Sequence, residues 1–180
     1  MIELGFSFIH PKKNSLVQMS SEDLVYSTYS SEHSLPAIIS LIEKDLSEPY
    51  SVFTYRYFVN RFPNLCEMVH NGAGELIAVI VCKIDPHEKS ARTRGYIGML
   101  AVRQDYRKQK LGSKLVSIVL DRMKEMGADE CVLEAEESNH GALSLYRRLG
   151  FVRTKYLRNY YLSGSDAYRL KKLFTPLVVS

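Results

Sequence analysis

Residues 96–116 restrict the fold of this chain more than any other stretch of its sequence. They begin as an apolar run typical of a buried strand, pass through a short basic turn at 107–110, and continue with apolar residues at helical spacing from Leu111. A strand that leads directly into a helix directs several unpaired backbone N–H groups at one point, which suits an anionic ligand. The stretch predicts an α/β domain with a candidate phosphate site at the turn, although the same pattern also occurs as an ordinary solvated turn.

Composition limits the class of protein without indicating its chemistry. The 180 residues fit one domain with a sizeable core, and the net charge of +4 is too small to indicate nucleic-acid binding. Residues 1–23 are expected to form an N-terminal extension, residues 24–174 the domain, and residues 175–180 a C-terminal tail. The 3 cysteines lie far apart in apolar runs, and no apolar run reaches the ~20 residues of a membrane helix. These features predict buried, reduced thiols, no metal site and a cytoplasmic location.

Apolar spacing and turn residues divide the domain into helices and strands. Helices are expected at 34–46, 52–61 and 111–126, and from Asn139 to Gly150. Strands are expected at 24–29, 65–70, 76–84, 95–102, 130–136, 151–156 and 167–173, with a polar loop at 85–94. This order predicts one mixed sheet flanked by helices, with the strands at 95–102 and 130–136 parallel because a helix joins them.

Two signatures within these elements resemble the GNAT family of acetyl-CoA-dependent N-acetyltransferases. After the strand at 95–102 the family has Arg/Gln-x-x-Gly-x-Gly/Ala, and this chain has Arg107, Lys110 and Gly112 at the corresponding positions. The second signature matches at Asn139, Ala142, Tyr146, Gly150 and Phe151. The resemblance implies the GNAT fold, in which a mixed central sheet of about seven strands splays between strands 4 and 5 and is flanked by about four helices.

Within the family the chain resembles the catalytic subunits of NatC-type N-terminal acetyltransferases. The shared stretches are 45–51, 55–58, 82–87, 94–102 and 160–161, within residues 24–174. The resemblance implies direct transfer of acetyl from acetyl-CoA, without a metal, to nascent proteins that begin Met-Leu, Met-Ile or Met-Phe. It also implies a large auxiliary subunit that anchors the enzyme to the ribosome and a small Sm-like subunit, with no direct binding of nucleic acid or membrane.

Glu134 is the residue to which the resemblance assigns the general base, acting through a water molecule. From the sequence alone, an acidic residue in the middle of a strand can equally be an exposed charge, since Glu136 shares its face. A modest base suffices for this reaction, because an α-amine has a pKa of about 7.7–8 and is partly neutral at physiological pH.

Tyr146 lies one helical turn beyond Ala142, so both residues are expected to face the splay. The resemblance implies that its hydroxyl donates a proton to the departing CoA thiolate, which suits a phenol of pKa about 10 beside a thiol near 8.5. A buried core tyrosine is the alternative.

The resemblance also implies which residues hold acetyl-CoA. Backbone groups at 100–102 are expected to bind the acetyl and pantetheine arm, and 107–113 the pyrophosphate. The full set is Leu100, Ala101, Val102, Arg107, Lys108, Gln109, Lys110, Leu111, Gly112, Ser113, Asn139, Ala142 and Tyr146. Lys110 departs from the family's glycine, which permits positive φ; a lysine there is expected to cost about 1–2 kcal/mol, offset in part if its charge pairs with phosphate.

Residues from two loops are expected to bind the substrate peptide. They are Glu48, Pro49, Tyr50, Phe53, Tyr160 and Tyr161. An aromatic lining suits apolar N-terminal side chains, although the aromatic residues of the helix at 52–61 are equally consistent with the edge of a core.

Two other functions fit parts of the sequence. One is a GNAT enzyme that acetylates a small amine such as a polyamine, against which the aromatic Tyr50, Tyr160 and Tyr161 argue. The other is a non-catalytic acetyl-CoA-binding module, and its only support is Lys110, which replaces the family's glycine.

Overall fold

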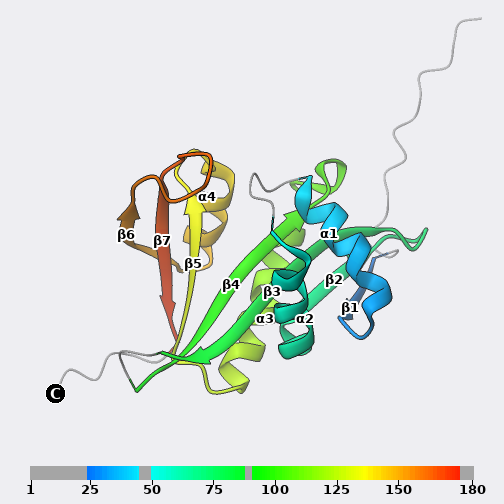
Figure 1. Ribbon diagram of the computed structural model, residues 1–180, viewed down its shortest axis with the longest axis horizontal. Coiled ribbons are helices and arrows are strands. Elements are labelled where there is room, and N and C mark those ends of the chain that lie inside the picture. The colour runs from blue at the N-terminus through cyan, green and yellow to red at the C-terminus, as the bar shows by residue number, and fades with distance from the viewer. Residues whose placement is uncertain (1–23, 45–49, 88–90, 175–180) are drawn as a thin grey trace, which may run out of the picture.

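The computed structural model describes residues 24–44, 50–87 and 91–174 (Figure 1). The strands are β1 (Val25–Thr28), β2 (Cys66–His70), β3 (Leu76–Pro86), β4 (Thr93–Val102), β5 (Glu130–Glu136), β6 (Val152–Leu157) and β7 (Ala167–Leu173). The α-helices are α1 (Leu35–Glu43), α2 (Val52–Arg61), α3 (Leu111–Glu125) and α4 (His140–Arg148). Short 3-10 helices occupy Glu32–Ser34, Pro63–Leu65 and Gln104–Tyr106.

These bounds confirm most of the expected elements, and two differ. The helix expected at 34–46 ends at Glu43, and residues 45 and 46 of that prediction lie outside the described residues. The loop expected at 85–94 is shorter than predicted. Its polar ends continue the β3–β4 ladder, in which Asp85 pairs with Arg94.

One seven-stranded sheet runs through the molecule in the order β1-β2-β3-β4-β5-β7-β6. Every neighbouring pair is antiparallel except β4 and β5, which are parallel as predicted. The β4–β5 register stops at Tyr96 and Val132, and the two strands then diverge (Figure 1). The chain therefore has the splayed, mixed sheet of the GNAT fold.

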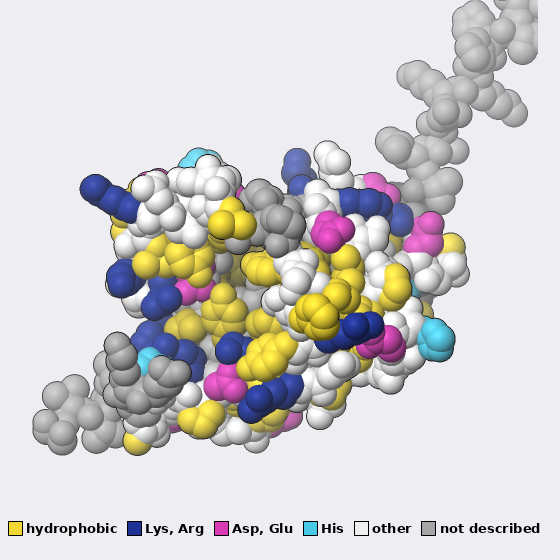
Figure 2. Space-filling model, viewed as in Figure 1, with side chains coloured by type: hydrophobic (Ala, Val, Ile, Leu, Met, Phe, Trp, Pro, Cys, Tyr) yellow, Lys and Arg dark blue, Asp and Glu magenta, His cyan; other side chains and the backbone are white. Residues whose placement is uncertain are grey.

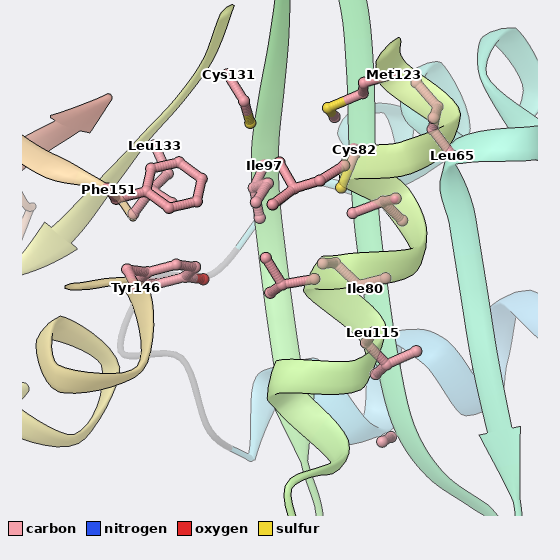
Figure 3. Packing of buried hydrophobic residues seen from close by; sticks show 14 of the residues in the cluster. Leu65, Ile80, Cys82, Ile97, Leu115, Met123, Cys131, Leu133, Tyr146 and Phe151 are labelled. Carbon is pink, nitrogen blue, oxygen red and sulfur yellow. The ribbon is translucent and has the colours of Figure 1, made fainter. Parts of the chain in front are cut away.

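Helices cover the two faces of the sheet unequally. α1 and α2 pack against one face of β3 and β4, around Ile38, Tyr55 and Met99. α3 and α4 lie on the opposite face, around Leu115 and Leu133 (Figures 1 and 3). The α1–α2 layer does not extend over β5, β7 and β6, so this part of the sheet is free of described helices on that face (Figure 1).

A β-bulge in β4 changes which side chains face which helix layer. Val81 pairs with Met99 and Cys82 with Ile97, which leaves Gly98 as the extra residue. Ile97 packs on the α3 side, whereas Met99, two residues later, packs on the α1–α2 side. Gly98 has little room for a side chain, since a Cβ atom there would lie 3.0 Å from the Phe58 ring.

The three cysteines are free and buried, as predicted. Burial raises the pKa of the Cys66 and Cys131 thiols to about 12, and it raises that of Cys82 well above its usual range. Among the described residues, no helix is both long enough and apolar enough to cross a bilayer.

Candidate active site

Glu134 lies where β4 and β5 separate, and its carboxylate is held from both sides. The Tyr96 hydroxyl of β4 donates to Glu134 Oε2 at 2.9 Å, and Arg169 Nε of β7 donates to Oε1 at 2.7 Å. The Glu134 side chain is only 5% exposed. The alternative of a solvent-exposed strand charge is therefore wrong for this residue.

Sequence reasoning missed Tyr96 and Arg169 as parts of this site. Burial, followed by the neighbouring Glu134 carboxylate, raises the pKa of Tyr96 well above its usual value, so its hydroxyl stays protonated and can donate. The only sequence signal for Arg169 is a cation between the apolar residues Ala167 and Leu170 of an expected strand. Its contact with Glu134 follows from the β5–β7 register, in which the two residues stand directly opposite each other.

Tyr146 is a buried core residue whose hydroxyl also points toward the splay, so both environments expected for it are present. It is 5% exposed and belongs to the core on the α3–α4 side, with its ring edge-on to Phe151 at 5.5 Å between centroids. Figure 3 shows its hydroxyl directed toward β4, on which Ile97 lies. Burial raises the pKa of the phenol well above its usual value, so the group stays protonated at neutral pH.

Asn139 starts the helix that carries Tyr146. Its Oδ1 accepts a hydrogen bond from the Ala142 N–H at 3.0 Å, which confirms the expected N-cap. The same helix packs closely on α3, since a Cβ atom at Gly112 would lie 3.0 Å from Leu145. The glycine of the first signature is thus required for helix packing.

The turn before α3 keeps a glycine-like backbone without glycine. Lys110 has φ 64° and ψ 10°, in the left-handed region, and Lys108 has φ 63°. Lys110 makes no side-chain cap to α3, and the first turn of this helix contains no acidic residue. The helix therefore presents its N-terminal N–H groups without a competing carboxylate.

Side chains around this turn differ in their exposure. Residues 107–110 are exposed, Leu111 and Gly112 are buried, and Ser113 is half-buried. Arg107 Nε donates to the Val102 carbonyl at 3.0 Å and so ties the turn to the end of β4.

The part of β4 after the splay has one open edge. Leu100, Ala101 and Val102 pair with β3, and their register includes no partner on β5. An extended ligand can add to such an edge as a further strand would. This edge, the uncapped helix end and Gly112 together fit the pantetheine and pyrophosphate parts of acetyl-CoA.

The three tyrosines expected to bind substrate lie near Glu134. Tyr50, Tyr160 and Glu134 all contribute electrostatically to a raised pKa at Tyr161, for which burial is the largest cause. The Tyr160 and Tyr161 rings meet edge-on at 5.1 Å. On the face seen in Figure 2, hydrophobic side chains gather in the hollow between the β5–β7 half and the α1–β4 half of the molecule.

The remaining substrate-site expectations are less well supported. Phe53 is 75% exposed, so its side chain is not part of the core, and no contact with Glu134 is found for it among the described residues. Phe58, on the same helix, is a core residue that is 8% exposed. Glu48 and Pro49 lie outside the described residues.

Comparison with known proteins identifies the family. Residues 35–151 match the family described as "Acetyltransferase (GNAT) family". The chain is 50% identical over 152 residues to N-alpha-acetyltransferase MAK3 of Arabidopsis thaliana, covering 84% of this chain and 78% of that protein. The chain belongs to the GNAT acetyltransferase family. This GNAT chain is also 52% identical over 146 residues to human N-alpha-acetyltransferase 30, covering 81% of this chain but only 40% of the longer human protein.

Solved structures extend the comparison. A chain in the crystal structure of the NatC complex bound to Gag peptide and CoA is 42% identical to this GNAT chain. Its TM-score is 0.82, and the match covers 85% of this chain and 99% of that one. Arabidopsis thaliana Naa50, with 22% identity, a TM-score of 0.74 and coverage of 84% and 99%, shares the fold.

The relatives and the site together define the kind of enzyme. With curated N-alpha-acetyltransferases about half identical to it, this GNAT protein is an acetyl-CoA-dependent N-terminal acetyltransferase. In the part of the chain that is described, no group of three or more His, Cys, Asp or Glu residues could hold a metal ion.

Proposed function

We propose that this enzyme acetylates the α-amine of nascent proteins that begin with Met followed by Leu, Ile or Phe. The observation that carries the proposal is the buried Glu134 carboxylate at the splay, beside the aromatic group formed by Tyr50, Tyr160 and Tyr161. A carboxylate at the end of an aromatic-lined site suits an amine attached to an apolar side chain. The 42% identical chain from a NatC complex bound to a peptide supports this choice of substrate class.

Acetyl-CoA is the donor in this scheme. The open edge of β4 at Leu100, Ala101 and Val102 holds the acetyl and pantetheine arm, and residues 107–113 hold the pyrophosphate through N–H groups at the start of α3. Asn139 and Ala142 shape the adjoining end of α4, which brings Tyr146 toward the thioester. The uncapped N-terminus of α3 supports this assignment.

Proton transfer is divided between two residues. The amine attacks the thioester carbonyl, the C–N bond forms, and the C–S bond breaks. Glu134 receives the amine proton through a water molecule or through the Tyr96 hydroxyl, which already donates to it. Tyr146 gives its proton to the departing sulfur, a role supported by its protonated state and the direction of its hydroxyl (Figure 3).

The peptide enters from the side opposite the α3 turn. Tyr50, Tyr160 and Tyr161 surround its first side chains, together with Glu48, Pro49 and Phe53 from the segment that precedes and begins α2. The rings of Tyr50, Tyr160 and Tyr161 suit an apolar side chain better than they suit the several positive charges of a polyamine. This is the ground for placing the small-amine alternative second.

The enzyme works in the cytoplasm as part of a NatC-type complex. Its expected partners are a large auxiliary subunit that docks on the ribosome and a small Sm-like subunit. The similarity to a chain solved within a NatC complex supports this proposal. Deletion of residues 1–23 followed by co-purification tests whether that segment contributes to the assembly.

A peptide panel tests the proposed function, with CoA release as the measurement. The panel contains a Met-Leu peptide, the same peptide with a blocked α-amine, a Ser-Glu peptide, an internal-lysine peptide and spermidine. We expect release only with the free Met-Leu amine, with the auxiliary subunits added if required. Preference for the lysine peptide or spermidine would overturn the N-terminal proposal, and preference for Ser-Glu would overturn the Met-hydrophobic one.

A further inference from the structure

We propose that Arg169 is a positioning residue for acetyl transfer, which acts on the reaction through the Glu134 carboxylate and not through the substrate. The inference rests on the proposed role of Glu134 as the proton acceptor. It adds a second-strand contribution to the site, since Glu134 belongs to β5 and Arg169 to β7.

The geometry divides the two carboxylate oxygens between two tasks. Arg169 Nε binds Oε1 at 2.7 Å, and the Tyr96 hydroxyl binds Oε2 at 2.9 Å. A carboxylate oxygen accepts more than one hydrogen bond, so Oε2 can also accept from an incoming amine or from a bridging water. Arg169 thus holds the oxygen that faces away from β4, and Oε2 is kept on the side of the splay.

Glu134 needs this anchor because of its place in the sheet. The β4–β5 register ends at Tyr96 and Val132, so at Glu134 the described strand β5 has a ladder only with β7. A glutamate side chain with three rotatable bonds would otherwise sample several rotamers, and proton transfer needs the acceptor within hydrogen-bond reach. Arg169 stands directly opposite Glu134 on the partner strand, where its side chain can fix one rotamer.

The ion pair between Lys171 and Glu130, on the same face of the sheet, is a structural contact with which the Arg169–Glu134 pair can be compared. Lys171 Nζ, on the same strand, binds Glu130 Oε2 at 2.8 Å, and the two side chains are 28% and 1% exposed. Glu130 also pairs with Arg94 and Arg92, so removing Lys171 leaves the carboxylate with partners. By contrast, Arg169 is the one cation paired with Glu134 among the described residues, and it lies at the splay.

The test is a double-mutant cycle with R169Q, E134Q and the combined variant, using a saturating Met-Leu peptide and varied acetyl-CoA. We expect R169Q to lower kcat by about 10- to 100-fold and to leave the KM for acetyl-CoA within about 2-fold. In the E134Q background the same change should lower kcat by less than about 2-fold, because a residue that acts through another has nothing further to contribute. R169K, which keeps the positive charge and can still donate to Oε1, should recover most of the lost rate.

K171Q is the matched control. It removes an equivalent cation two positions along β7, and we expect kcat to stay within about 2-fold of the wild type. Additive effects of R169Q and E134Q would overturn the inference, as would unchanged kcat in R169Q or equal loss in R169Q and K171Q. If R169Q does not fold, the cycle is run with R169M, which also removes the cation, and additivity with E134Q again overturns the inference. An inactive wild type on the Met-Leu peptide would instead refute the proposed function, so the two failures are distinguishable.

Discussion

Lys110 holds a left-handed backbone conformation at the entrance to α3, where the family pattern has glycine. For a residue with a Cβ atom this conformation costs about 1–2 kcal/mol, and the surrounding turn must supply that energy. The sequence left open whether a lysine at this position would change the backbone conformation. In the structure Lys110 adopts the left-handed conformation despite its strain. A lysine there also brings a charge to the turn proposed to bind pyrophosphate.

Strain and charge at Lys110 can be separated by two substitutions. Lys110→Gly should raise the free energy of unfolding by up to about 1 kcal/mol, since relief of strain exceeds the added flexibility of the unfolded chain. Lys110→Ala keeps the strain and removes the charge, so its stability should match the wild type. Both variants should bind CoA a few-fold more weakly, with a smaller salt dependence. Urea denaturation and calorimetric titration at two ionic strengths measure these effects, and a Gly variant less stable than the Ala variant would contradict the account.

Tyr146 makes a second prediction at the scale of one residue. Tyr146→Phe removes the proposed acid but keeps the ring that packs on Phe151. We expect kcat to fall by about 10²- to 10⁴-fold, the usual range for a general acid, with little change in thermal stability. Because burial raises the pKa of this phenol, its deprotonation should not limit wild-type kcat at any pH below about 10. Rates that fall less than about 10-fold in the variant would remove Tyr146 from the mechanism.

At the scale of secondary structure, α4 carries its N-cap, Asn139, at one end and the active-site residue Tyr146 near the other. Asn139 accepts from the Ala142 N–H at the start of a helix that runs only from His140 to Arg148, so a frayed first turn affects much of the element. The position of Tyr146 depends on that helix.

Asn139→Ala should lower the free energy of unfolding by about 1 kcal/mol, because it leaves the Ala142 N–H without its acceptor. Asn139→Asp keeps an acceptor and adds a charge favourable at a helix N-terminus, so it should retain wild-type stability. Urea denaturation of the three proteins measures the difference. Equal losses in the Ala and Asp variants would show that the amide does something other than cap the helix.

The helices and strands could be predicted from the sequence where they depend on local pattern. The contacts of the active site could be predicted only in part. β5 and β7 begin and end at the expected residues, because apolar spacing and flanking turns define them. The contact between Arg169 and Glu134 joins residues 35 apart and depends on strand register, which local pattern does not specify. Tyr96 bonds Glu134 across the divergence of two parallel strands, which again is a property of the assembled sheet.

On the scale of the whole molecule, the three buried thiols link stability to pH. Burial raises the pKa of Cys66 and Cys131 from 9.0 to about 12 and that of Cys82 well above 9.0, so the folded protein keeps protons that the unfolded chain releases. Unfolding then releases protons, and the stability present below about pH 9 is lost as the pH rises toward 12.

We expect the free energy of unfolding, measured with urea under reducing conditions, to decline above pH 9. Each thiol contributes up to about 1.4 kcal/mol per pH unit in that window. Cys131→Ala should decline less steeply than the wild type between pH 9 and 11, whatever its stability at pH 7. Parallel curves for the two proteins would show that this thiol is not responsible.

The bulge at Gly98 limits how the length of β4 can change. Upstream of it Tyr96 reaches the acceptor Glu134, and downstream of it Leu100 and Val102 approach Gly112 on the cofactor side. Loss of one residue at this point would move every downstream side chain of β4 to the opposite face of the sheet. The turn at 71–74 joins two antiparallel strands, and its length can vary without such an exchange. In evolutionary terms, β4 can accept replacements of residues far more readily than single-codon insertions or deletions.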